Sequence, residues 1–286
     1  MAETDLRPMT LGEVLDRTFS LYKTHFWLFA GIMSLPLLAL LLFQVCAAGL
    51  GIAGATAGRG VGAAPTAGTI AGVAFGAIIG VVLYFALYGA AQAATVFAVS
   101  DLYLGRQASV RGSFTQVRGK ILRALGVIFL TGLIVFVGTL ALIIPGLILL
   151  ARTGVSVPTA MLEDESPSAA ISRSMELTKG FGMQMFLIFL LVWVLSMVVT
   201  IIFQFPLLFL AAEAARPHVA SFTYSILSDL ASFISSVVIG PIGTIAFSLM
   251  YYNLRVRKEA FDLQHLMASL GSSSGRVVSP GASPVA

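Results

Sequence analysis

The sequence predicts an all-α integral membrane protein with six transmembrane helices and three amphipathic helices on its cytoplasmic side. Of the 286 residues, 58% are hydrophobic and only 10% are charged, whereas a soluble domain carries about 25% charged residues. The apolar residues gather in six long runs, and the mean hydropathy is +0.95. The basic residues lie between those runs in a regular order. These observations exclude an ordinary soluble domain, and they exclude a disordered chain.

Six stretches reach the roughly 20 apolar residues that a helix needs to cross the hydrocarbon core of a bilayer. They are 26–50, 70–99, 121–141, 143–162, 181–210 and 233–252. The fourth contains Arg152 and Pro158, so a full crossing and a re-entrant or broken helix both stand open. We expect residues 1–9 to be a flexible N-terminus, 10–265 the membrane domain and 271–286 a disordered tail.

The positions of Lys and Arg predict the orientation. With six spans, 14 of the 17 basic residues fall on one side. Arg59 and Arg216 fall on the other side, and Arg152 lies within a span. Because basic residues concentrate in cytoplasmic loops, we expect a multi-pass protein of the cell membrane with both termini in the cytoplasm.

Short amphipathic helices are predicted before the first, third and fifth spans, lying flat at the headgroup level. Ser109 is expected to cap the second of them, and Ser166, followed by Pro167, the third. Residues 17–23 also align with 173–179, and more loosely with 112–118. Two interpretations stand open: a repeat of three units, each a surface helix and a two-helix hairpin, or chance similarity between short amphipathic helices.

A cluster of basic residues follows the second span. Each basic residue near an anionic membrane surface contributes about 1 kcal/mol of binding. One interpretation is contact with lipid headgroups, and the other is that the charges only fix the topology. The residues are Arg106, Arg111, Arg118, Lys120 and Arg123.

Two ionisable residues lie in or near the spans. Such groups are costly in a bilayer and often have a partner. Arg152 and Asp229 either form an ion pair within the membrane, or Asp229 lies in water while Arg152 binds carbonyls freed near Pro158. Additive effects of the two mutations would exclude the pair.

We find no catalytic motif, cofactor motif or metal-ligand cluster in the sequence, and we expect no cofactor and no nucleic-acid partner. His25, His218 and His265 fall on different segments. The acidic run Glu163-Asp164-Glu165 indicates either an ion site or the solvated start of a helix.

Several segments together resemble the glycerophosphoryl diester phosphodiesterase membrane-domain family. They are 11–19, Ile144-Pro145-Gly146, 158–164, 170–180 and, most specifically, 251–263. The resemblance implies a membrane fold and location. It implies no phosphodiesterase activity, because we expect this chain to be a stand-alone member without the catalytic barrel of about 250 residues.

These features predict a non-enzymatic membrane protein that organises or assists lipids or partner proteins at the cytoplasmic face. Its expected partners are the lipid bilayer, anionic lipids in particular, and an unidentified membrane or cytoplasmic protein. The alternative is a small transporter or channel for an amphiphilic solute, with Arg152 and Asp229 in its pathway. A lipid-modifying enzyme ranks third.

Overall fold

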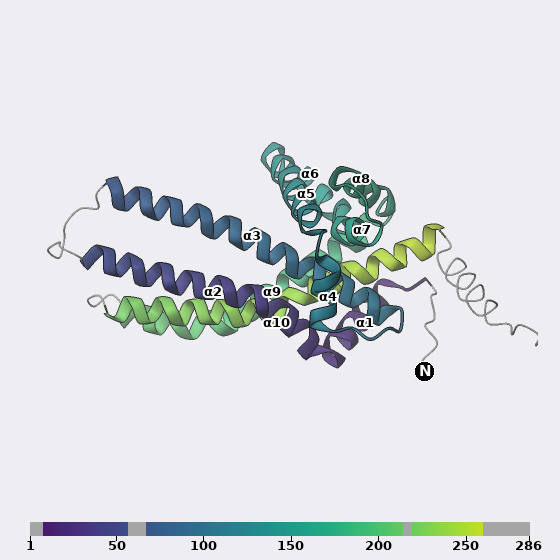
Figure 1. Ribbon diagram of the computed structural model, residues 1–286. Coiled ribbons are helices and arrows are strands. Elements are labelled where there is room, and N and C mark those ends of the chain that lie inside the picture. Colours follow the sequence, from purple (N-terminus) through teal and green to yellow (C-terminus); the bar gives the residue numbers. More distant parts are fainter. Residues whose placement is uncertain (1–7, 57–66, 214–218, 260–286) are drawn as a thin grey trace, which may run out of the picture.

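The computed structural model describes residues 8–56, 67–213 and 219–259 (Figure 1). These residues form helices joined by short connections, and six helical segments are long and apolar enough to cross a membrane. The protein is therefore an all-α, multi-pass membrane protein, as the sequence predicts. Residues 1–7 and the tail 271–286 lie outside the described residues, but the main chain of Met9 is bound to Asn253.

The helices follow the predicted order. They are α1 (Leu11–Thr24), α2 (Phe26–Thr56), α3 (Ala67–Tyr103), α4 (Val110–Val117), α5 (Ile121–Ala141), α6 (Ile143–Arg152), α7 (Ser156–Leu162), α8 (Pro167–Leu177), α9 (Gly182–Glu213) and α10 (Val219–Glu259). The sixth apolar segment is longer than expected, since it covers Ile226–Glu259 instead of 233–252. Asp229 therefore lies inside a helix.

Helices α1, α4 and α8, which were predicted as amphipathic helices before the odd-numbered spans, each begin at a side chain that caps the first turn. Thr10 and Glu13 form a capping box at α1, and the hydroxyls of Ser109 and Ser166 accept backbone N–H groups of α4 and α8, as predicted. Apolar side chains of these helices are buried against the protein, including Val14, Val117 and Leu177. These side chains contact neighbouring helices instead of lipid, and a place at the membrane interface stays a prediction.

The fourth span is a broken helix, which was one of the two alternatives. Pro158 has no N–H to donate to the carbonyl of Gly154, and its ring would clash with that carbonyl in a continuous helix. The helix accordingly ends at Arg152 and restarts at Ser156. The carbonyl of Arg152 accepts hydrogen bonds from Ser174 (2.9 Å) and Thr178 (3.0 Å), so α8 closes the break.

The chain is arranged as three units that close into a ring: α1–α3, α4–α7 and α8–α10. The last helix of each unit packs against the first two helices of the next. Thus α3 packs against α4 and α5, the broken helix α6–α7 against α8 and α9, and α10 against α1 and α2. The inner helices α3, α7 and α10 also contact one another. This cyclic order supports the three-unit repeat.

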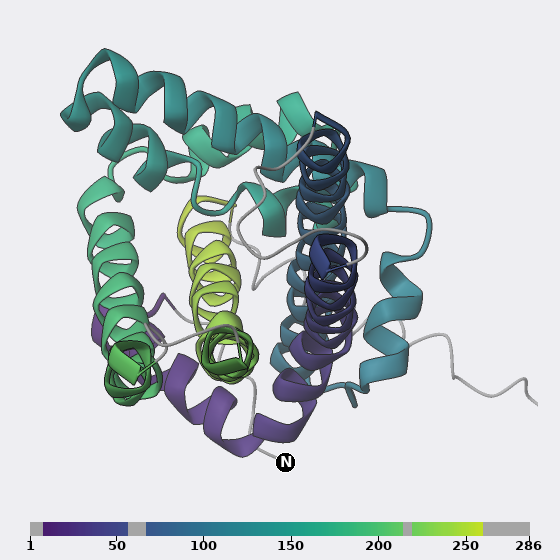
Figure 2. The same cartoon turned by 90° about the vertical axis from the view of Figure 1, so that its left-hand side faces the viewer.

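Helix bounds in the first and third units support the repeat as well. The starts of α1 and α8 and the starts of α2 and α9 are each separated by 156 residues. The same displacement aligns Arg17 with Arg173. The second unit differs from the other two in orientation, because its hairpin α5–α6 is inclined to the long helices (Figures 1 and 2).

All three inner helices finish at one end of the molecule, together with α1, α4 and α8, and we call this the charged end (Figure 1). Here the ring is closed by Asn253 of α10, whose amide oxygen accepts the N–H of Met9 (2.8 Å) and whose amide nitrogen donates to the Met9 carbonyl (3.0 Å). Asn253 is fully buried. Six crossings are an even number and bring the two ends of the chain to the same side. The contact between Met9 and Asn253 likewise places both residues at the same end.

Candidate functional site

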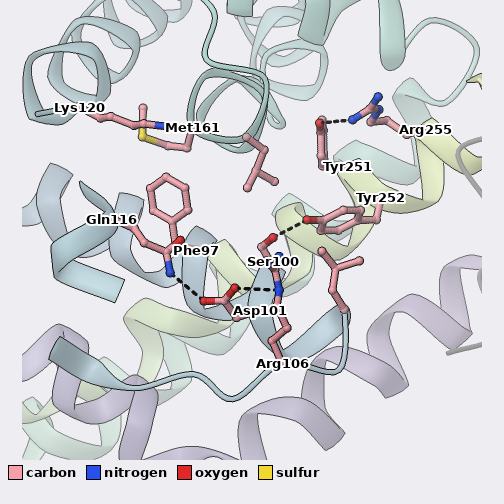
Figure 3. Close-up of a pocket in the computed structure, with 12 residues that line it drawn as sticks. Phe97, Ser100, Asp101, Arg106, Gln116, Lys120, Met161, Tyr251, Tyr252 and Arg255 are labelled. Atoms are coloured by element: carbon pink, nitrogen blue, oxygen red, sulfur yellow. Dashed lines mark hydrogen bonds and ion pairs between the residues drawn. The ribbon is translucent and has the colours of Figure 1, made fainter. Parts of the chain in front are cut away.

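A pocket of about 320 Å³ opens at the charged end, where the inner helices of all three units meet (Figure 3). Its walls come from four separate stretches of the chain: 97–106, 116–120, 161–162 and 251–255. The lining residues are Phe97, Ser100, Asp101, Leu104, Arg106, Gln116, Lys120, Met161, Leu162, Tyr251, Tyr252 and Arg255. Because each unit of the ring contributes to it, the pocket depends on the whole fold.

The inner wall is buried and carries hydroxyl groups. Ser100 Oγ and Tyr252 Oη lie 2.7 Å apart and hydrogen-bond across α3 and α10. The ring of Tyr252 stacks on Tyr103, with centroids 4.7 Å apart. Met161 and Phe97 supply an apolar side (Figure 3). These contacts fix the wall in one arrangement, since the rings have few rotamers and both hydroxyls are paired.

The rim of the pocket is charged. Arg106 Nε lies 3.3 Å from Asp101 Oδ1, and Gln116 donates to the other oxygen of the same carboxylate at 2.9 Å. Lys120 Nζ lies 2.5 Å from Asp164 Oδ1 and over the ring of Phe97. The rim therefore presents cations from two connections between helices, each held by a nearby carboxylate.

Glu163 joins three elements behind the pocket. It accepts hydrogen bonds from Tyr251 Oη (2.8 Å) and Arg173 Nε (3.3 Å), and Arg255 Nε lies 3.7 Å away. Glu259 in turn pairs with Arg173 and Arg255. The acidic run was expected to be an ion site or a solvated helix start. Glu163 and Asp164 bind basic side chains of other segments, while Asp164 and Glu165 are also exposed before α8, as a solvated helix start would be. Among the described residues no group of three or more His, Cys, Asp and Glu side chains could hold a metal ion.

Asp164 is more exposed than Glu163 and Glu259. Its hydrogen bond with Lys120, followed by that with Arg123, holds the pKa of the carboxyl below its ordinary value, although partial desolvation opposes the shift. Its backbone has a positive φ of 55°, a conformation that Asp adopts more readily than most residues. The carboxylate is therefore stabilised in its charged form.

The structure divides the five predicted headgroup contacts into two groups. Arg106, Lys120 and Arg123 are in ion pairs with Asp101 or Asp164, and the first two of them line the pocket. Arg111 and Arg118 are exposed on or directly after α4 and have no ion-pair partner among the described residues. The five residues thus lie close together in the chain but face different surroundings.

Arg152 and Asp229 are not brought together. Arg152 Nη2 donates to the carbonyl of Met175 at 3.4 Å, near the end of α8. Arg152 precedes the pocket residue Leu162 by 10 residues. Asp229 precedes the pocket residue Tyr251 by 22 residues. Asp229 thus lies more turns before the pocket than Arg152 does, and the contact that Arg152 makes is with α8. The guanidinium binds the carbonyl of Met175 in α8, whereas the alternative interpretation expected carbonyls freed near Pro158.

Sequence reasoning missed the tyrosines and Ser100. A signal was present: Tyr251, Tyr252 and Arg255 share one helical face at the end of a span, where an aromatic and basic patch is unusual for a lipid-facing surface. The pairing of Tyr252 with Ser100 joins residues 152 positions apart, so no local pattern contains it.

No family model, curated protein or solved structure matches the chain.

Proposed function

We propose that this protein is a non-enzymatic, multi-pass protein of the cell membrane that organises lipids or assists partner proteins at its charged end, with both termini in the cytoplasm. The observation that carries the proposal is the concentration of cations at that end: Arg111 and Arg118 are exposed beside a pocket rimmed by Arg106 and Lys120. Anionic headgroups bind such surfaces through charge.

The short helix α4 is well placed for this role. It packs on α3 and α2, and its buried residues Ser113 and Val117 hold it against the bundle. Arg111 and Thr115 are exposed on its other side. A rigid helix presents its cations at less entropic cost than a mobile loop does.

The test is lipid retention by the full chain in nanodiscs that contain neutral lipid with or without anionic lipid. The double variant Arg111→Ala/Arg118→Ala should retain less anionic lipid, as counted by native mass spectrometry, and raised salt should weaken retention in the unchanged protein. The variant Arg17→Ala/Lys23→Ala removes the same charge from exposed positions of α1 and serves as the matched control. Equal retention by both double variants would contradict the proposal.

Transport of an amphiphilic solute is the second candidate, and the break between α6 and α7 is the observation that favours it. Broken helices line substrate sites in many transporters. Here a Cβ at Gly154 would lie 2.7 Å from Met185 and 3.0 Å from Phe189, so the break packs closely against α9. Solute uptake into proteoliposomes that is lost in Arg152→Ala would favour transport.

A further inference from the structure

We infer that the pocket at the meeting point of α3, α7 and α10 binds a phosphate group, carried either by a membrane lipid or by a soluble phosphate. The inference rests on the proposed function for its location at a membrane face, and it names a specific site and ligand chemistry. It differs from the surface contact of Arg111 and Arg118, because neither residue lines the pocket.

The charge of the lining favours an anion. Arg106, Lys120 and Arg255 line the pocket, and among the described residues Asp101 is the one carboxylate in the lining. Behind the lining lie further members of the network, namely Glu163, Asp164, Glu259, Arg123 and Arg173. Arg173 also pairs with Glu176, so the wider network is balanced in charge. The excess of cations lies in the lining itself, where a phosphate in the pocket would meet it.

The geometry of the donors suits phosphate in particular. Arg guanidinium groups can donate two parallel hydrogen bonds to a phosphate, and Lys binds it as a point charge. The three cations come from three places in the ring: the α3–α4 connection, the residue before α5, and α10. Ser100 and Tyr252 add hydroxyl groups on the wall between them (Figure 3). Cations from separate elements can surround a ligand, whereas cations along one helix contact it from one side only.

The size and the apolar side indicate a small ligand or a headgroup. A volume of about 320 Å³ is at the lower end for ligand pockets, which range from about 300 to 1,000 Å³. Phe97, Met161 and Leu162 form an apolar side that fits the carbon portion of a phosphate ester. An entire lipid does not fit, so only its headgroup would enter.

The experiment measures thermal unfolding of the full chain in neutral-lipid nanodiscs, with inorganic phosphate added against chloride of equal ionic strength. A parallel arm replaces phosphate with phosphatidic acid in the nanodisc. We expect a rise in the midpoint in at least one arm. A rise with inorganic phosphate indicates a soluble source, and a rise with phosphatidic acid alone indicates a lipid source. No rise in either arm overturns the inference.

Variants connect the effect to the pocket. Arg106→Gln/Lys120→Gln should weaken phosphate binding by about tenfold or more, since charge-assisted hydrogen bonds are lost. Leu104→Trp fills the pocket without changing charge and should remove the midpoint shift, which covers the case in which the double variant fails to fold. Arg17→Gln/Lys23→Gln is the control. A shift that survives Leu104→Trp overturns the inference, whereas loss of lipid retention in Arg111→Ala/Arg118→Ala bears on the proposed function alone.

Discussion

The inner helices and the outer helices of the ring use apolar residues in different ways. Leu249 of α10 is fully buried, whereas Leu140 of α5 is 70% exposed, although both lie in segments apolar enough to cross a membrane. The outer helices α5 and α9 are among the most apolar and least buried segments, while α10 is the most buried and contains Thr244, Ser248 and Asn253. The inner helix α3 is mostly exposed over its first half and buried mainly from Gly89 to Ser100. Polar side chains are thus buried in α10, and apolar ones face outward on α5 and α9, as expected where lipid is the solvent.

The largest expected effect comes from cavity formation in an inner helix. Leu249→Ala should lower the free energy of unfolding by about 2–5 kcal/mol, because the removed atoms leave a cavity in a closely packed site. Leu140→Ala, its outer-helix control, should change stability little, since lipid replaces the lost contacts. Unfolding of both variants in lipid micelles compares them. Equal losses would contradict the division into inner and outer helices.

A smaller loss is expected from Glu163→Gln, which keeps an acceptor but removes the charge that Arg173, Arg255 and Tyr251 share. The expected cost is about 1–3 kcal/mol. Glu165→Gln changes an exposed neighbour and should stay within about 0.5 kcal/mol. Unfolding in micelles measures both, and identical stabilities would mean that the network does not hold the inner helices together.

Arg152 at the end of α6 and Asp229 in α10 offer a test between distant positions of the bundle. Because they do not contact each other, the losses of stability in Arg152→Ala and Asp229→Ala should add in the double variant to within about 0.5 kcal/mol. Melting of the three variants in detergent measures this. A coupling well above that value would show that the two side chains do pair across the bundle.

The smallest effect concerns pH at the exposed edge of the network. The pKa of Asp164 is lowered by Lys120 and Arg123, so its contribution to stability is complete above the unfolded value of about 3.9 and is lost as pH falls through the lower folded value. Because Asp164 is exposed, the contribution should stay below about 1 kcal/mol. Asp164→Asn should remove it, with Asp16→Asn as the control, in unfolding measured from pH 6 to 3. A loss that appears only on raising the pH would contradict the sign.

The sequence was sufficient for features that depend on local pattern. Hydropathy located the spans, and α5 begins and ends where it was predicted. Ser109 and Ser166 cap the helices expected of them, and Pro158 explains the broken fourth span. Each of these features depends on residues within a turn or two of one another.

Features that depend on distant residues escaped prediction. Periodicity predicted an apolar side for α1 and α8, but lipid and protein both satisfy such a side, so the burial of Val14 and Leu177 in protein could not be inferred. The carboxylate of Glu163 meets partners from α8 and α10 only after the ring closes. The pocket likewise forms only when the ring closes, because its lining comes from four separate stretches of the chain.

The ring requires that the first helices of all three units lie on the same face of the membrane. Exposed positions on these helices, Arg17, Arg111 and Ser172, can each be replaced by cysteine in a Cys46→Ala background. Labelling with an impermeant maleimide in intact and permeabilised cells then reports the side. The three positions should react alike, only after permeabilisation if the charged end is cytoplasmic, and one position that reacts from the opposite side would contradict the three-unit ring.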